Sequence, residues 1–95
     1  MRIAKPPEGF RLIVRPEVVE QVSTLTDAAP WLPRAFADVK ERLRVAGHRV
    51  GRETSRIRGG RLLQENDPVT NSPRLLVVYK VLGDTLTIVS LKVIL

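Results

Sequence analysis

Residues 74–93, RLLVVYKVLGDTLTIVSLKV, decide the fold of this chain, because only Gly83 and Asp84 separate two β-rich runs. Glycine followed by aspartate between such runs indicates a β-hairpin, and glycine in the first position suits a type II′ turn. A two-residue turn also fixes how the two strands pair. The predicted partners are Leu82 with Thr85, Lys80 with Thr87, Tyr79 with Ile88, and Val78 with Val89.

Side-chain alternation divides this hairpin into two faces. We expect Tyr79, Ser90 and Lys92 on one face. Arg74 and Lys80 are expected on the other. Apolar residues dominate both faces, which is typical of strands inside a sheet or beneath a partner. The hairpin is therefore predicted to form the centre of a sheet.

The upstream sequence supplies helices and further strands. Residues 10–15 predict a short strand, and Pro16 can open a helix that continues to about residue 25. A second helix is predicted where apolar residues recur at helical spacing: Leu32, Phe36, Val39, Leu43 and Ala46. Residues 61–66 predict one more strand, and the prolines and polar residues after it indicate a loop.

This order of elements predicts an α+β fold. An N-terminal strand leads into a two-helix hairpin. Three antiparallel strands follow, forming a mostly antiparallel sheet with the helices on one side. A length of 95 residues suits one domain over residues 1–95, because two domains would each lack a sizeable core.

The net charge of +6 is concentrated in residues 42–61, while the segments on either side are each neutral. That stretch holds Glu53 as its only acid and seven arginines: Arg42, Arg44, Arg49, Arg52, Arg56, Arg58 and Arg61. Such a segment favours phosphate-rich or acidic partners. Arg49, Arg52, Arg56, Arg58 and Arg61 are predicted to bind nucleic-acid phosphates. The alternatives are a solvated surface, and for Arg42 and Arg44 an interaction with the helix dipole.

The composition argues against several classes of site and location. With one histidine and no cysteine, His/Cys metal clusters and a Cys–His dyad are excluded, and we expect no metal and no cofactor. His48 could act as a general base, but a lone histidine at a helix end is more often a surface or capping group. No apolar run reaches the length of a membrane span, and residues 1–10 lack the apolar core of a secretory signal. These features predict a cytoplasmic protein without membrane contact.

The few aromatic residues argue against a base-stacking groove. Contact with the nucleic-acid backbone through basic side chains is the remaining mode. An enzyme can also cleave RNA in this way, because cations stabilise the charge of a phosphorane-like transition state.

The C-terminal hairpin resembles the RelE/ParE superfamily of toxins from type II toxin–antitoxin systems. Members show an arginine entering a strand that ends V-Y-x-V, then a polar turn and a strand of the form x-V-x-I-L-x-V. Here RLLVVYKV, LGDT and LTIVSLKV occupy those places. The family arginine corresponds in position to Leu76, and Arg74 lies two residues earlier on the same predicted face.

The resemblance implies a cytoplasmic toxin restrained by an antitoxin protein. RelE-type members cut mRNA on the ribosome without a metal, whereas ParE-type members inhibit DNA gyrase. For the first activity the candidate catalytic residues are Arg74, Arg61, Tyr79, Lys80 and Lys92. Two alternatives stay open: a non-enzymatic module that binds nucleic acid or an acidic protein, and a toxin-like fold without activity.

Overall fold

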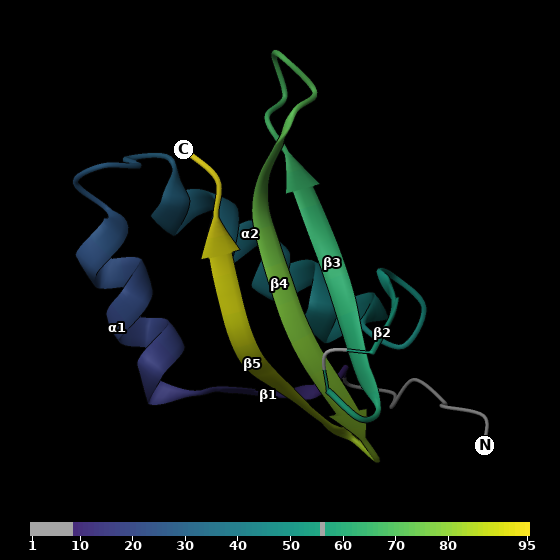
Figure 1. Cartoon of the computed structure of the whole chain (residues 1–95). Helices are drawn as coiled ribbons and strands as arrows, with labels where there is room; N and C mark the ends of the chain where they lie inside the picture. The colour runs from purple at the N-terminus through teal and green to yellow at the C-terminus, as the bar shows by residue number, and fades with distance from the viewer. Residues whose placement is uncertain (1–8, 56) are drawn as a thin grey trace.

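The computed structural model describes residues 9–55 and 57–95. Two helices and a five-stranded mixed sheet form an α+β fold (Figure 1). The elements are β1 (Arg11–Val14), α1 (Pro16–Leu25), α2 (Leu32–Ala46), β2 (Arg52–Thr54), β3 (Gly60–Asn66), β4 (Pro73–Leu82) and β5 (Thr85–Val93). The predicted strand and helix order is confirmed, with β2 as an addition.

The sheet has the strand order β1-β5-β4-β3-β2. β1 runs parallel to β5, and the other neighbours are antiparallel. The prediction that the C-terminal hairpin lies inside the sheet is confirmed, because β4 and β5 both have neighbours on each side. The sequence did not predict β2, which is only three residues long and pairs with β3.

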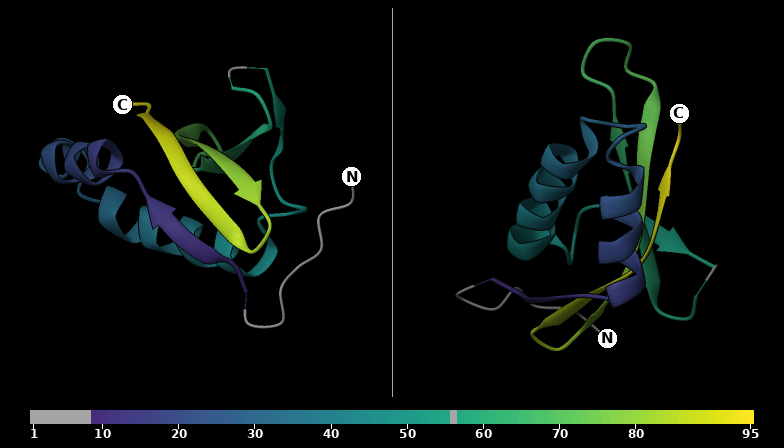
Figure 2. Two further views of the ribbon diagram at one scale, coloured as in Figure 1. Left: turned by 90° about the horizontal axis from the view of Figure 1, so that it is seen from below. Right: turned by 90° about the vertical axis from the view of Figure 1, so that its left-hand side faces the viewer.

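The core lies between the two helices and one face of the sheet, and α1 contributes Val18 to it. α2 buries the apolar positions predicted for it, including Leu32, Phe36, Val39 and Leu43. The sheet contributes buried residues from its central strands: Leu63, Leu75, Val77, Tyr79, Leu86, Ile88 and Leu91. Both helices lie on the same side of the sheet, as Figure 2 shows edge-on. Over residues 9–55 and 57–95, the opposite side of the sheet therefore carries no helix.

The turn between β4 and β5 has the predicted form. Gly83 has a φ of 61°, and Asp84 keeps a negative φ, which are the signs that a type II′ turn requires. The predicted pairs Leu82–Thr85, Lys80–Thr87 and Tyr79–Ile88 are confirmed.

The connection from α2 to β2 approaches the sheet closely at Gly51. This glycine has a φ of +73°, and a Cβ placed on it would lie 2.6 Å from the Leu62 carbonyl oxygen and 3.0 Å from the Tyr79 hydroxyl. Gly59 has almost the same φ, +72°, with nothing within 4 Å of its added Cβ. The two glycines therefore differ in crowding and not in backbone conformation.

We predict that Gly51→Ala lowers the free energy of unfolding more than Gly59→Ala. The positive φ alone should cost about 1–2 kcal/mol at either position. Collision with the β3 backbone should add about 1–3 kcal/mol at Gly51. Urea unfolding of both variants measures the difference, and equal losses would contradict the close approach.

Candidate nucleic-acid interface on the open face of the sheet

The sheet side without helices is called the open face here. Paired residues of neighbouring strands share a face, and side chains alternate along each strand. The strand positions between the buried ones, together with their partners in the register, therefore make up the open face. Its exposed cations come from different strands: Arg11 on β1, Arg52 on β2, Lys80 on β4 and Lys92 on β5. Among the described residues, no strand position of this face holds a carboxylate, and none of these cations has an ion pair.

A β-bulge places Lys92 on this face. The predicted pairing of Val78 with Val89 is wrong, because Val78 pairs with Ser90 and the register shifts between Val78 and Tyr79. Val89 is thus an extra residue in β5, and an extra residue reverses the side on which every later side chain lies. The prediction that Ser90 and Lys92 share the face of Tyr79 is wrong for this reason. Both lie instead on the face of Lys80.

Arg74 does not accompany Lys80, which corrects the predicted sharing of a face. It lies at a second bulge, where Glu65 pairs with Leu75 and Asn66 pairs with Pro73. Its guanidinium stacks on the Trp31 ring, 4.4 Å from the centroid, at the start of α2. It also donates two hydrogen bonds to Glu65, Nε to Oε2 at 2.7 Å and Nη2 to Oε1 at 3.0 Å. These bonds raise the pKa of Arg74 and satisfy its charge within the protein.

Tyr79 and Arg61 form a second internal cluster. The Tyr79 side chain is fully buried, and its hydroxyl shares its hydrogen between the carbonyl oxygens of Val50 at 2.6 Å and Gly47 at 2.9 Å. Arg61 donates to the Val50 oxygen through Nε and Nη2, and to the Gly51 oxygen through Nη2. Burial raises the pKa of Tyr79, against smaller opposing effects of Arg61 and Arg42. The cluster fastens the connection after α2 to the sheet.

The other arginines predicted to bind phosphate lie around the β2–β3 hairpin. Arg49, Arg52 and Arg58 are exposed, and Arg56 lies outside the described residues. Figure 2 shows β2 and the following turn on the side of the sheet opposite the helices. A Cβ on Gly60 would collide with the Ile57 side chain, so the turn folds back over the open face. Arg52 lies on the open face through its pairing with Leu62, and Arg58 lies exposed in the turn before β3; these two residues are called the β2–β3 wall here.

The open face offers charge without aromatic rings. Phe10, Phe36 and Tyr79 are buried, and Trp31 holds Arg74. Bases therefore have no ring on which to stack, and contact with sugar–phosphate backbone is the available mode. Over residues 9–55 and 57–95, no group of three or more His, Asp or Glu residues could hold a metal ion.

Arg11 was not among the residues predicted from the sequence to belong to this site. Its strand lies far from residues 42–61, and its face is determined only by the parallel pairing of Arg11 with Thr85. The pattern that could have indicated it is alternation along β1: Leu12 and Val14 are half-buried on one face, which leaves Arg11 on the other.

Comparisons of this chain with protein-family models, with curated proteins and with solved structures find no match. No helix in the described part of the chain is long and apolar enough to cross a membrane.

We predict that Tyr79→Phe lowers the free energy of unfolding by about 1–2 kcal/mol at neutral pH, because buried carbonyl oxygens lose a donor. The raised pKa of Tyr79 means that folding favours its neutral form. The Tyr79 hydroxyl therefore contributes to the free energy of unfolding of the wild type at pH values below its ordinary pKa of 10.0. This contribution is lost as the pH rises above that value. Urea unfolding across that range should show this loss in the wild type and its absence in Tyr79→Phe. Identical pH profiles would contradict the role of the hydroxyl.

Proposed function

We propose that this protein is the toxin of a type II toxin–antitoxin system and cleaves mRNA on the ribosome, as RelE-type toxins do. The observation that carries the proposal is the open face, where Lys80 and Lys92 stand exposed on neighbouring strands with no carboxylate among the described residues of that face. The mixed sheet with a helical hairpin on one side also suits the fold that the RelE/ParE resemblance implies.

Metal-independent RNA cleavage needs positive charge at the phosphate. The ribose 2′-oxygen attacks the neighbouring phosphorus and loses its proton to water. The bond from phosphorus to the 5′-oxygen breaks, and that oxygen gains a proton. Charge builds on the non-bridging oxygens in the transition state. Lys80 is the group we propose to stabilise that charge and to protonate the leaving oxygen. Lys92 pairs with Leu76, four positions from Lys80 along β4, and would bind a neighbouring phosphate.

Flanking phosphates would contact the arginines of the β2–β3 wall. Arg52 pairs with Leu62 on the open face, and Arg58 lies exposed in the turn. Since guanidinium groups bind phosphate in a planar, two-bonded geometry, these residues would position the strand while Lys80 acts on the phosphate that is cleaved. The net charge of +6 also suits an acidic antitoxin as partner.

Induction of the protein in bacteria tests this proposal. We predict growth arrest with cuts in translated mRNA for the wild type, and loss of both in a Lys80→Glu, Lys92→Glu double variant. Arg34→Glu makes the same kind of charge reversal at an exposed position of α2 and should stay toxic. Harmless induction of folded wild-type protein would contradict the proposal, as would arrest with intact mRNA.

A second candidate function is binding without cleavage. One observation favours it: three of the predicted catalytic residues, Arg74, Arg61 and Tyr79, are engaged inside the protein. This candidate includes a ParE-like inhibitor of DNA gyrase, a non-enzymatic module and a toxin-like fold without activity. Arrest accompanied by DNA damage and uncut mRNA would identify the gyrase inhibitor.

The salt dependence of oligonucleotide binding tests whether the open face contacts nucleic acid, under either candidate function. We predict that binding of a labelled single-stranded oligonucleotide weakens steeply with salt, and that bases are not distinguished. Replacing Lys80 and Lys92 by glutamine should reduce the slope of log affinity against log salt by about 1.4, because each lost contact contributes about 0.7. An unchanged slope would place the nucleic acid elsewhere.

A further inference from the structure

A pocket lies at the end of the sheet where β3 ends and β4 begins, beyond the part of β3 that pairs with β2 (Figure 1). Its volume of about 450 Å³ falls within the usual range of ligand sites. Three segments that are distant in the sequence line it: the connection before α2, the β3–β4 loop with the start of β4, and the residues after β5. Its described lining residues include none of the cations of the open face, so the pocket is distinct from the candidate nucleic-acid interface.

The β3–β4 loop gives this pocket a polar wall that is held by its own hydrogen bonds. The Asp67 N–H donates to the Ser72 carbonyl oxygen at 2.8 Å, and the Asn71 N–H donates to the Asp67 carbonyl oxygen at 2.8 Å. Oδ1 of Asp67 accepts from the N–H groups of Thr70 and Val69, which lower the pKa of this carboxyl. The loop therefore presents a negative charge together with the hydroxyl groups of Thr70 and Ser72.

A positive charge lines the same pocket. Arg74 gives Nε and Nη2 to Glu65, whereas its Nη1 has no hydrogen-bond partner among the described residues. The Glu65 bonds raise the pKa of Arg74, and the charge of Asp67 raises it further. No ion pair joins Arg74 to Asp67 in the described part of the chain. Two opposite charges thus act on one another across the pocket without closing it.

The remaining wall of the pocket is apolar. Ile94 and Leu95 are 40% and 78% exposed, and Trp31 is half-buried beneath the guanidinium of Arg74. The Ile94 N–H donates to the Arg74 carbonyl oxygen at 2.9 Å, which keeps the residues after β5 beside the start of β4. Pro73 completes this surface. The pocket therefore places an apolar surface beside a carboxylate and a guanidinium.

We infer that this pocket binds the zwitterion of an α-amino acid with a large apolar side chain. The ligand carboxylate would accept hydrogen bonds from Nη1 of Arg74. The ligand ammonium group would donate to the second carboxylate oxygen of Asp67 and to the hydroxyl groups of Thr70 and Ser72. The ligand side chain would cover Ile94 and its apolar neighbours, and the burial of that surface favours binding.

Ligands with a single charge fit the pocket less well. A carboxylate or a phosphate is repelled by the charge of Asp67. An amine without a carboxylate is the nearest competitor, because Glu65 already compensates the charge of Arg74. Such an amine leaves Nη1 of Arg74 without an acceptor, and an unmade hydrogen bond costs affinity. The zwitterion is the ligand that satisfies both charged groups.

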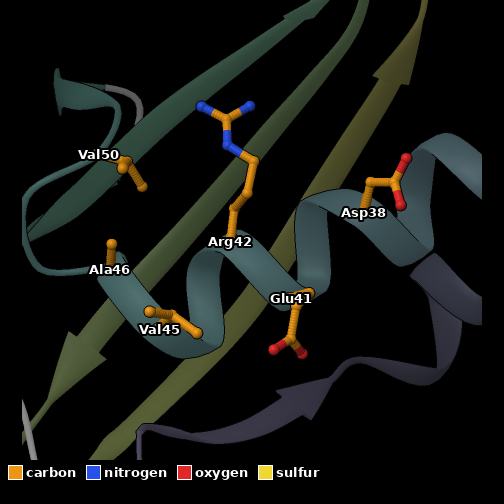
Figure 3. Close-up of a pocket in the computed structure, with 6 residues that line it drawn as sticks. All are labelled: Asp38, Glu41, Arg42, Val45, Ala46 and Val50. Carbon is orange, nitrogen blue, oxygen red and sulfur yellow. The ribbon is translucent and has the colours of Figure 1, made fainter.

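A second hollow, beside the second half of α2, supplies the control (Figure 3). It also has a carboxylate and a guanidinium in its lining, Asp38 and Arg42, one helical turn apart. Its apolar lining consists of Val45, Ala46 and Val50, and its described lining residues include no aromatic ring and no hydroxyl group. Asp38→Asn therefore makes the same change of charge as Asp67→Asn in a hollow that lacks the other features.

Fluorescence of Trp31 measures binding directly, because it is the only tryptophan of the chain and it lines the pocket. The probe is L-phenylalanine, compared with phenethylamine, which lacks the carboxylate, with phenylpropanoate, which lacks the ammonium group, and with L-alanine. We expect the wild type to bind L-phenylalanine with a Kd below about 1 mM. The three other compounds should each bind at least about tenfold more weakly.

The variants test which carboxylate is used. Asp67→Asn keeps the side-chain oxygen that accepts from the loop N–H groups but removes the charge, so it should weaken binding of L-phenylalanine about tenfold. Asp38→Asn should leave the affinity within about twofold. Amide NMR spectra show whether each variant is folded. In the wild type, L-phenylalanine should shift the signals of residues 70, 74 and 94 more than those of residues 52 and 80.

Several outcomes would overturn the inference: a wild-type Kd above about 1 mM, equal affinity for phenethylamine or phenylpropanoate, or an equal loss in Asp38→Asn and Asp67→Asn. The result does not depend on the proposed function. Harmless induction of the protein in bacteria would end that proposal and leave the amino-acid binding as measured.

Discussion

The packing of α2 across β4 and β5 is the interaction on which the rest of the structure depends. Val39 and Leu43 of the helix and Val77, Tyr79 and Ile88 of the strands are almost completely removed from solvent. Burial of this apolar surface is the main favourable contribution to folding, and it commits one face of the sheet to the interior. In the part of the chain that the structure describes, no helix covers the opposite face, so its side chains meet solvent or a partner. The candidate interface follows from this asymmetry together with the few lysines and arginines that happen to lie on the open side.

Much of the fold could be predicted from residues with strong local preferences. Pro16 opens α1, the apolar spacing from Leu32 to Leu43 defines α2, and Gly83 with Asp84 specifies the turn and the adjacent pairs. The bulges could not be predicted, because Val89 is as suitable for a regular strand as its neighbours. β2 was missed because its stability comes from pairing with β3, a contact that three residues do not encode locally.

The candidate site was predicted less well than the fold, for a physical reason. Charge density along the sequence drew attention to residues 42–61, yet a guanidinium can be satisfied by backbone carbonyls as readily as by phosphate. Arg61 is used in this way, and Arg74 is held by Glu65 and Trp31. The sequence assigned Lys80 and Lys92 to opposite faces, whereas the bulge at Val89 places both on the open face, four residue positions apart along the sheet. The resulting surface depends on tertiary contacts that residue spacing alone does not contain.

The parallel pairing of β1 with β5 has a consequence for synthesis of the protein. It joins the first strand of the chain to the last, and β5 also contributes Leu86, Ile88 and Leu91 to the interior. During translation, the helices and β1 leave the ribosome long before their partner strand exists. The interior cannot close until β5 has emerged, so the nascent chain exposes apolar surface until that strand is available. Any activity that requires the assembled sheet is consequently withheld until β5 has been synthesised.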